Sequence, residues 1–224
     1  MKKAVIVVAA GSGSRMGGQI PKQFLRLQGK PLIIHTLEKF RKFDPEMKMV
    51  VVLAPAHRKL WEEVAASYDI CNGLLLADGG DRRFSSVKNG LALITEEGLL
   101  GIHDAVRPLV SMDTLARTYD SALREGSGIP VMEMEESVRM LLAGGTSSHM
   151  DRSKLRKVQT PQVFRSEQIK EAYKQAYSPT FTDDASVYES LHGKLSLVEG
   201  NRENIKITTP TDMSLASLLI ASPE

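Results

Sequence analysis

The sequence predicts an α/β protein built on a doubly wound, mostly parallel sheet. Short apolar runs, several of them rich in β-branched residues, alternate with stretches in which apolar residues recur at helical spacing. Runs that are apolar throughout are typical of strands covered on both faces, and strand–helix alternation implies parallel pairing. The 224 residues include 42% hydrophobic and 25% charged residues, so the composition suits one globular domain spanning residues 1–224.

The apolar runs and helical patterns give a set of expected elements. Strands are expected at 4–9, 49–54, 74–77, 99–103, 128–132, 195–199 and 205–208, and helices at 31–43, 58–68, 84–94, 114–124, 166–177, 184–191 and 212–220. In the first helix Ile33, Leu37 and Phe40 recur at i, i+4 and i+7, and Pro31 suits its first turn. Thr211 is the expected N-cap of the last helix.

One stretch, residues 133–164, breaks this rhythm. Two β-type runs, at 137–142 and 147–158, flank the turn pair Gly144-Gly145, which is typical of a protruding hairpin. An arm at about 133–160 has too few residues to build its own core, so it is expected to pack on another surface. A dimerisation arm and a flexible surface excursion both remain open on spacing alone.

Composition excludes several classes of protein. A formal net charge of +2 and only 5% aromatic residues argue against a nucleic-acid partner, so cations placed locally must bind any anionic ligand. The single cysteine, Cys71, allows no intrachain disulfide and is expected to be a small packed side chain. The apolar start leads directly into a glycine-rich loop, and no run reaches the ~18 residues that span a bilayer. We therefore expect a cytoplasmic protein with no membrane segment.

The first segment whose residues could bind a ligand is residues 8–24, V-A-A-G-S-G-S-R-M-G-G-Q-I-P-K-Q-F. A predicted strand ends there in a loop that contains Gly11 and Gly13, together with the cations Arg15 and Lys22. Glycines let backbone N–H groups converge on phosphate oxygens, and the cations add full charges. The loop does not match the P-loop spacing, and Met16 occupies the third glycine position of the dinucleotide fingerprint. A nucleoside triphosphate is favoured over a glycine-rich connection with two solvated cations.

Two more segments come directly after predicted strands. In G-G-D-R-R-F-S-S-V, residues 79–87, Asp81 and Ser86 could bind a base or ribose, or simply cap a helix. In H-D-A-V-R-P, residues 103–108, Asp104 lies at the carboxyl edge of the sheet, where ligands of open α/β sheets collect. A carboxylate near phosphates is a natural Mg²⁺ ligand, although Asp104 could instead cap a turn or pair with Arg107. His103 is expected to be structural.

Late in the chain, the cations Arg152 and Lys206 lie in the segments M-D-R-S-K-L and N-I-K-I-T-T-P. Between these two come the segments T-P-Q-V-F and T-D-D-A-S. A lysine within a β run is more often solvent-facing. With these segments assembled, the sequence resembles the 2-C-methyl-D-erythritol 4-phosphate cytidylyltransferases of the non-mevalonate isoprenoid pathway. The match runs from Ala9-Ala10-Gly11 to Lys206, and its motifs are specific in combination.

The resemblance implies a Rossmann-like fold of the nucleotide-diphospho-sugar transferase type, a homodimer, Mg²⁺ as cofactor, and CTP and a sugar-alcohol phosphate as substrates. It implies that Arg15 and Lys22 stabilise charge at the α-phosphorus and that Lys206 also serves catalysis. The residues that match the CTP-binding positions are Ala9, Ala10, Gly11, Gly13, Gly80, Asp81 and Ser86. Those that match the second-substrate positions are Asp104, which also serves the metal, Arg107, Ser137 and Arg152. In the family the arm crosses to the partner subunit, which would supply Arg152 in trans.

The chain departs from the family pattern at Ser137, where threonine is common, and at Val8, where proline is common. The implied reaction needs no base, because the attacking substrate phosphate is already an anion. Catalysis is therefore expected to depend on positioning and on cations. The alternatives are a D-ribitol-5-phosphate cytidylyltransferase with the same fold and chemistry, and a non-catalytic nucleotide-binding module. A Rossmann dehydrogenase is excluded by Met16.

Overall fold

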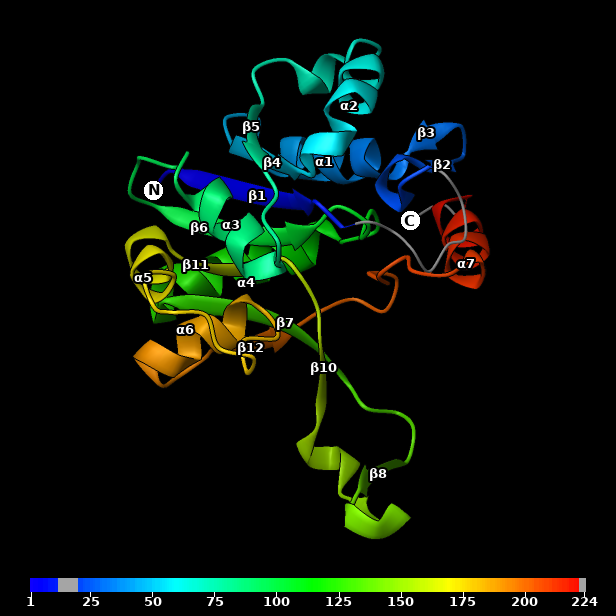
Figure 1. Ribbon diagram of the computed structural model, residues 1–224, viewed down its shortest axis with the longest axis vertical. Helices are drawn as coiled ribbons and strands as arrows, with labels where there is room; N and C mark the ends of the chain where they lie inside the picture. The colour runs from blue at the N-terminus through cyan, green and yellow to red at the C-terminus, as the bar shows by residue number, and fades with distance from the viewer. Residues whose placement is uncertain (12–19, 222–224) are drawn as a thin grey trace.

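The computed structural model describes residues 1–11 and 20–221 and has a twisted central sheet with helices on both faces (Figure 1). Eight strands form the sheet in the order β10-β7-β11-β6-β1-β4-β5, with β12 beside β7. Their bounds are β1 Lys3–Ala9, β4 Lys48–Leu53, β5 Leu75–Asp78, β6 Leu99–Asp104, β7 Ser127–Glu133, β10 Arg156–Val158, β11 Gln162–Arg165 and β12 Leu197–Glu199. A separate short hairpin joins β2 Arg26–Leu27 to β3 Lys30–Pro31.

Four neighbouring strands, β6, β1, β4 and β5, pair in parallel. β11 runs antiparallel between β6 and β7, and β12 is parallel to β7. The sheet is therefore mixed but mostly parallel, and the predicted fold class is confirmed. Parallel neighbours need crossovers of a dozen or more residues, which the intervening helices supply.

The helices divide between the two faces of the sheet. Their bounds are α1 Leu32–Phe43, α2 Arg58–Ala65, α3 Arg83–Leu91, α4 Met112–Glu125, α5 Ser166–Ala172, α6 Asp184–His192 and α7 Pro210–Ala221. On one face α1, α2 and α4 pack against Val5 and Val7 of β1. On the other face α3, α5 and α6 pack against Ala4 and Ile6 of the same strand. Side chains alternate across a strand, so β1 contributes to both cores, which is what a doubly wound sheet requires.

The seventh helix, α7, packs away from the sheet, on the β2–β3 hairpin and the loop after β6. Leu27, Val106, Ile207 and Ala216 form the buried centre of this third cluster. The prediction of Thr211 as the N-cap is wrong, because α7 begins at Pro210. The carboxylate of Asp212 instead accepts hydrogen bonds from the backbone N–H groups of Thr208 and Thr209 just before the helix.

Six of the seven predicted strands and all seven predicted helices have a counterpart, usually with ends shifted by a few residues. The predicted strand at 205–208 is wrong, because this segment pairs with no strand of the sheet. Its Ile207 N–H bonds only the Val106 carbonyl, 3.0 Å away. Conversely β11, inside the irregular stretch, was not predicted, because its apolar centre is only Val163 and Phe164.

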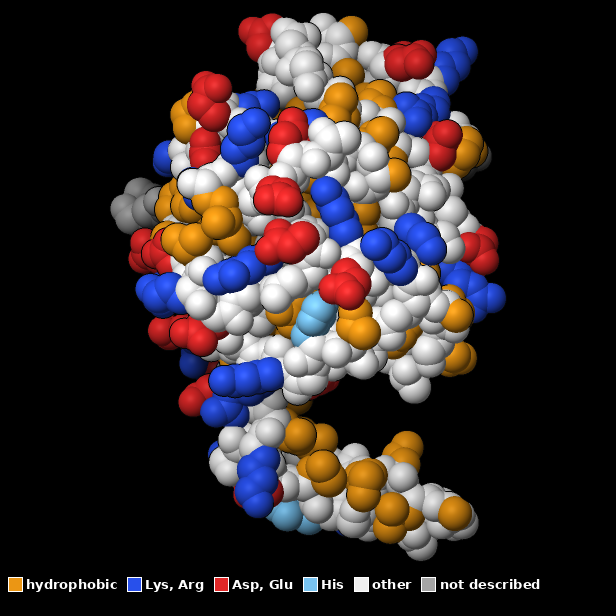
Figure 2. Space-filling view, turned by 90° about the vertical axis from the view of Figure 1, so that its left-hand side faces the viewer, with side chains coloured by type: hydrophobic (Ala, Val, Ile, Leu, Met, Phe, Trp, Pro, Cys, Tyr) orange, Lys and Arg blue, Asp and Glu red, His pale blue; other side chains and the backbone are white. Residues whose placement is uncertain are grey.

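The irregular stretch does form a protruding hairpin, which we call the arm and define as residues 134–155 (Figure 1). Its strands are β8 Val138–Leu141 and β9 Ser147–Met150, which pair with each other and with no other strand among the described residues. The second predicted run continues into β10, which returns to the main sheet beside β7. Apolar side chains gather along the arm, and Leu141 at 85% exposure is the most open of them (Figure 2).

In the part of the chain that is described, no helix has both the length and the apolar character that a membrane crossing requires.

A glycine in β7 gives a test of this packing. A Cβ on Gly128 would lie 2.1 Å from the Thr118 carbonyl oxygen of α4, so strand or helix must shift. We expect Gly128→Ala to lower the free energy of unfolding by about 1–3 kcal/mol, the usual cost of overpacking a core, in urea denaturation. Gly11→Ala is the control, because a Cβ there would meet none of the described residues within 4 Å. Equal stability of the two variants would contradict the close approach of β7 and α4.

Candidate active site at the carboxyl edge of the sheet

A cavity of about 400 Å³ opens at the carboxyl ends of the parallel strands. Its lining comes from the loops after β1, β5 and β6 and from the segment before α7. The lining residues are Val8, Ala9, Ala10, Gly11, Lys22, Gln23, Gly80, Asp81, Arg82, Arg83, Ser86, Asp104, Ala105, Val106 and Lys206. Sequence segments up to 198 positions apart (Val8 to Lys206) therefore meet at one edge.

Strand register explains why these loops meet. Val8 of β1 lies opposite Asp104 of β6, and Ala9 lies opposite Leu53 of β4, which in turn lies opposite Asp78 of β5. The three loops therefore leave the sheet at the same height. A Cβ on Gly79 would be 2.5 Å from the Cβ of Ala10, so glycine at this position permits the close approach of two loops.

Lys22 begins a short 3₁₀ helix, Lys22–Phe24, that returns the chain to the cavity. The next residue, Gln23, is 1% exposed and donates from Nε2 to the Ala9 carbonyl oxygen at 2.8 Å. This buried bond ties the helix to the end of β1 and so places Lys22 in the cavity wall. Gln23 is not among the predicted site residues, although it lies in the P-K-Q-F end of the segment at 8–24.

The loop of residues 79–82 is held by hydroxyl groups of α3. Ser86 accepts a hydrogen bond from the Gly80 N–H at 3.0 Å and donates to the Arg82 carbonyl at 2.9 Å. Ser85 donates to Asp81 at 2.7 Å, and this bond lowers the pKa of that exposed carboxyl. Ser86 is buried, so its hydroxyl holds the loop in shape while the loop backbone and Asp81 face the cavity.

Asp104, the last residue of β6, lies among cations. Its Oδ2 is 3.0 Å from Lys206 Nζ and 3.4 Å from Arg107 Nε. Asp104 is 7% exposed, and burial alone would raise its pKa. The charges of Arg83, Lys206 and Arg107 outweigh burial and hold the pKa of this carboxyl well below its usual range. Asp104 is therefore a permanent anion at neutral pH.

Buried hydrogen bonds fix the backbone around Asp104. The Asp104 N–H donates to Thr160 Oγ1 at 3.1 Å, and Thr160 Oγ1 lies 3.1 Å from His103 Nδ1. His103 Nε2 lies 3.1 Å from the Arg107 carbonyl oxygen. Burial lowers the pKa of His103 to about 4, so the ring is neutral, donates from Nε2 and accepts at Nδ1. His103 thus has the structural role that the sequence analysis expected.

The segment that bears Lys206 is held by neighbours rather than by a strand ladder. Arg107 donates to the Asn204 carbonyl at 2.7 Å, and Asn204 Nδ2 donates to the Thr160 carbonyl at 2.9 Å. Ile207, fully buried, anchors the other side of the lysine. Lys206 projects from this anchored segment with 43% of its side chain exposed, which leaves its ammonium accessible from the cavity.

Arg83 is a cavity residue that the sequence analysis missed. Its guanidinium pairs with Asp184 of α6 through Nη1 at 2.7 Å and Nη2 at 2.5 Å. Asp184 is fully buried and also accepts the hydroxyl of Tyr173 at 2.6 Å. The signal was present, since Arg83 and Asp184 lie in the quoted segments G-G-D-R-R-F-S-S-V and T-D-D-A-S.

Three predicted site residues lie elsewhere. Ser137 and Arg152 are exposed on the arm and do not line this cavity, and Arg152 donates to the Glu135 carbonyl. Arg107 is largely buried behind Asp104. Two further predicted residues, Gly13 and Arg15, lie outside the described residues.

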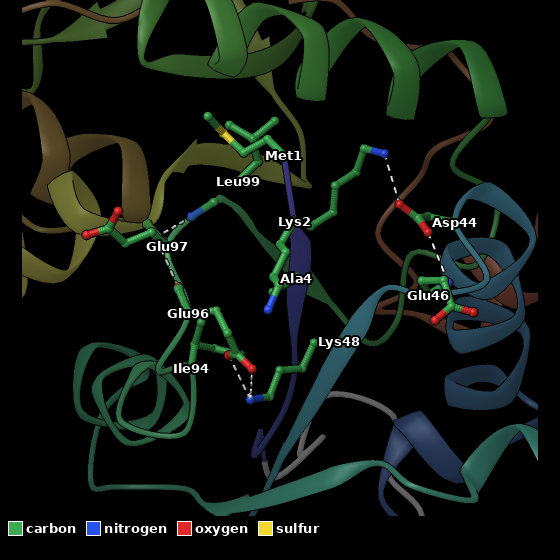
Figure 3. Close-up of a pocket in the computed structure, with 13 residues that line it drawn as sticks. Met1, Lys2, Ala4, Asp44, Glu46, Lys48, Ile94, Glu96, Glu97 and Leu99 are labelled. Atoms are coloured by element: carbon green, nitrogen blue, oxygen red, sulfur yellow. Dashed lines mark hydrogen bonds and ion pairs between the residues drawn. The ribbon is translucent and has the colours of Figure 1, made fainter.

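A second cavity, of about 630 Å³, lies at the opposite, amino edge of the sheet (Figure 3). Two ion pairs lie in its wall, one between Lys3 Nζ and Asp44 Oδ2 at 2.9 Å and one between Lys48 Nζ and Glu96 Oε2 at 2.8 Å. No predicted site residue lines it. This larger cavity has four acidic residues against three lysines in its lining, whereas the carboxyl-edge cavity has four cations against two carboxylates. We therefore assign the candidate site to the smaller cavity.

Metal ligation by the chain alone is not supported where side chains are described, since no cluster of three or more His, Cys, Asp or Glu residues could hold an ion. Asp104 supplies one carboxylate in the cavity. Mg²⁺ favours one or two carboxylates together with phosphate oxygens. The residues present therefore fit an ion shared with a bound polyphosphate.

Comparison with known proteins identifies the family of the chain. Residues 3–222 match the family model described as 2-C-methyl-D-erythritol 4-phosphate cytidylyltransferase. The curated protein of that name from Bacteroides thetaiotaomicron is 46% identical, over 98% of this chain and 100% of its own length. The one from Porphyromonas gingivalis is 44% identical, over 99% of each chain.

Solved structures agree in fold. A crystal structure of 2-C-methyl-D-erythritol 4-phosphate cytidylyltransferase from Francisella tularensis superposes with a TM-score of 0.80 at 31% identity, covering 97% of this chain and 99% of that one. The corresponding structure from Thermus thermophilus gives 0.77 at 29% identity, covering 99% and 100%. The resemblance seen in the sequence motifs is confirmed, and the chain belongs to the 2-C-methyl-D-erythritol 4-phosphate cytidylyltransferase family.

Proposed function

We propose that the protein transfers CMP from CTP to 2-C-methyl-D-erythritol 4-phosphate, giving 4-diphosphocytidyl-2-C-methyl-D-erythritol and pyrophosphate, in isoprenoid precursor biosynthesis. The observation that carries the proposal is the cavity at the carboxyl edge, which Lys22, Arg83 and Lys206 line together with the carboxylate of Asp104. A site of this charge suits two phosphorylated substrates. Family membership over nearly the whole chain supports the specific reaction.

The nucleotide side of the cavity is formed by the loops after β1 and β5. Ala9, Ala10 and Gly11 offer backbone at the end of β1, where a phosphate can approach, and the loop at Gly80 and Asp81 offers hydrogen bonds to base and ribose. Ser86 contributes by keeping the Gly80 N–H and the Arg82 carbonyl in place. Gly13 and Arg15 belong to the same proposed set through the sequence motifs.

The chemistry depends on charge. A phosphate oxygen of the sugar-alcohol phosphate attacks the α-phosphorus of CTP in line with the departing pyrophosphate, so no proton needs to be removed. Lys22 and Lys206 lower the repulsion between the two polyanions and stabilise the charge that spreads over the transferring group. Asp104 holds Lys206 at 3.0 Å and so sets where that ammonium lies.

We propose Mg²⁺ as the cofactor, held by the Asp104 carboxylate and the triphosphate oxygens. The ion would neutralise part of the triphosphate charge. The orientation of Asp104 toward it depends on the buried contacts of its backbone with Thr160.

We further propose a homodimer in which the arm packs on the partner subunit. Met140, Leu141 and Leu142 are 48%, 85% and 45% exposed on a hairpin whose strands pair with no other strand, and such a patch favours burial in an interface. Ser137 and Arg152, which lie on the arm away from their own cavity, would then serve the second substrate of the partner.

The first experiment is pyrophosphate release by purified protein with CTP and Mg²⁺, with 2-C-methyl-D-erythritol 4-phosphate compared with D-ribitol 5-phosphate. Release with the methylerythritol phosphate alone is the expected result. Release with ribitol phosphate alone would keep the mechanism and overturn the assigned substrate. Binding of CTP without release in either case would favour a non-catalytic nucleotide-binding module.

A lysine variant tests the role of the cations. We expect Lys22→Ala to reduce kcat by about 10²–10³, by analogy with the loss of one donor to a developing oxyanion, because the charge lost acts on the transferring phosphoryl group. Thermal unfolding should remain close to that of the unmodified protein. Lys59→Ala is the control, because Lys59 is exposed on α2 and lies outside the cavity. A near-normal kcat for Lys22→Ala would contradict the assigned role.

An arm variant tests the dimer. We expect Leu141→Arg to shift the protein toward monomer in analytical ultracentrifugation and to lower activity, because a charge replaces the most exposed apolar side chain of the arm. Leu197→Arg, at a side chain that is 55% exposed on β12, is the matched control and should change neither. A dimer that persists in Leu141→Arg with full activity would count against packing through the arm.

A further inference from the structure

The wall of the cavity contains a cation whose partners lie deep in the protein. Arg83 is the first residue of α3, Asp184 is the first residue of α6, and Tyr173 immediately follows α5. They form a continuous chain of contacts, from the Tyr173 hydroxyl to Asp184 Oδ1 at 2.6 Å and from Asp184 to both terminal nitrogens of Arg83. Of these three residues, Arg83 alone lines the cavity.

The inner end of the chain is held firmly. Tyr173 is 2% exposed, and its ring stacks on Phe84 with centroids 4.7 Å apart. The start of α6 is tied to β11, because Gln162 donates to Asp183 at 2.8 Å and accepts from the Ala185 N–H at 2.7 Å. A carboxylate at a helix N-terminus is also stabilised by the helix dipole. Asp184 therefore has one position, and Arg83 takes its direction from it.

The outer end keeps hydrogen-bonding capacity. A guanidinium has five N–H groups, and the pair with Asp184 uses one on each terminal nitrogen. This pair therefore leaves three N–H groups of Arg83 for a ligand. Because Asp184 balances its charge, the protein holds Arg83 in the cavity wall, with 30% of its side chain exposed, before any anion arrives.

We infer that Tyr173 and Asp184 are positioning residues that aim the Arg83 guanidinium at a phosphate bound in this cavity. The inference deepens the proposed function, since it takes the cavity to bind phosphorylated substrates. Both the triphosphate of CTP and the phosphate of the sugar alcohol have the required chemistry, because each offers oxygens to a planar guanidinium. Tyr173 acts through Asp184 and touches neither substrate.

Tyr173→Phe tests the inference, because it removes one hydroxyl from the buried end and leaves the Arg83–Asp184 pair in place. Tyr119→Phe is the matched control, since Tyr119 is 1% exposed and its hydroxyl donates to the Ala4 carbonyl at 2.9 Å, at the amino end of β1. Each variant loses one buried hydroxyl group, so both should lower Tm by a similar amount, about 2–6 °C.

Only Tyr173→Phe should change catalysis. We expect it to raise KM for one substrate about tenfold, as for the loss of one well-aligned charged contact, while Tyr119→Phe stays within about twofold of the unmodified protein. A higher KM for CTP would identify the nucleotide phosphates as the ligand of Arg83. A higher KM for the sugar-alcohol phosphate would identify the phosphate of that substrate instead. Indistinguishable kinetics for the two variants would overturn the inference and leave the chain of contacts as a purely structural clamp.

A second variant checks that the effect passes through Arg83. Arg83→Lys keeps the charge but loses the fork that Asp184 aligns. If Tyr173 acts through Arg83, adding Tyr173→Phe to Arg83→Lys changes KM less than it does in the unmodified protein. Fully additive effects on KM would contradict the inference.

Ligand-induced shifts in Tm separate this inference from the proposed function. They are measured with CTP alone and with 2-C-methyl-D-erythritol 4-phosphate alone, so they need no turnover. If the unmodified protein releases no pyrophosphate, the proposed reaction fails. A ligand shift that is smaller in Tyr173→Phe than in Tyr119→Phe would still support positioning of Arg83, and equal shifts with both compounds would overturn it.

Discussion

Parallel pairing of β6, β1, β4 and β5 is the constraint on which the site depends. Strands that run in the same direction in one sheet end at the same edge, and the loops after them are brought together whatever their separation in sequence. Gly79, directly after β5, then lets its loop approach Ala10 at the end of β1, and Gly80 lets the same loop lie close to Ser85 of α3. An antiparallel arrangement would have sent alternate loops to opposite edges and left Asp104 without its neighbours.

Local placement of charge, rather than net charge, prepares this edge for anions. The chain as a whole carries a formal charge of only +2, yet Lys22, Arg83 and Lys206 all line one cavity with Asp104. The two buried carboxylates, Asp104 and Asp184, hold Lys206 and Arg83 in fixed positions before a ligand binds. Electrostatic stabilisation by groups that need not reorganise is the most effective form available to an enzyme.

Local sequence pattern predicted the fold class and most of the edge, because both depend on which segments are strands and which residues come directly after each strand. Pattern failed where partners are distant. Apolar residues alternate at Ile205 and Ile207, and such a pattern reflects which side chains face the interior. It does not show where the backbone N–H groups bond, so an extended segment was predicted to be a strand. The Arg83–Asp184 pair spans 101 residues, and no local periodicity indicates that these two side chains meet.

Local sequence pattern predicts the hairpin of the arm but not the surface that the arm contacts. Its glycine turn and flanking β-type runs were sufficient to predict a hairpin, since turn chemistry is local. An isolated hairpin is at best marginally stable in water, so a two-stranded arm with exposed apolar side chains gains stability from whatever surface it contacts. The sheet places the cavity within one chain, and the arm keeps its apolar side chains exposed. Both observations favour a site that is shared between two subunits. We expect the cavity to offer a nucleotide its contacts within one subunit, and the arm residues predicted for the second substrate to act at the site of a partner subunit.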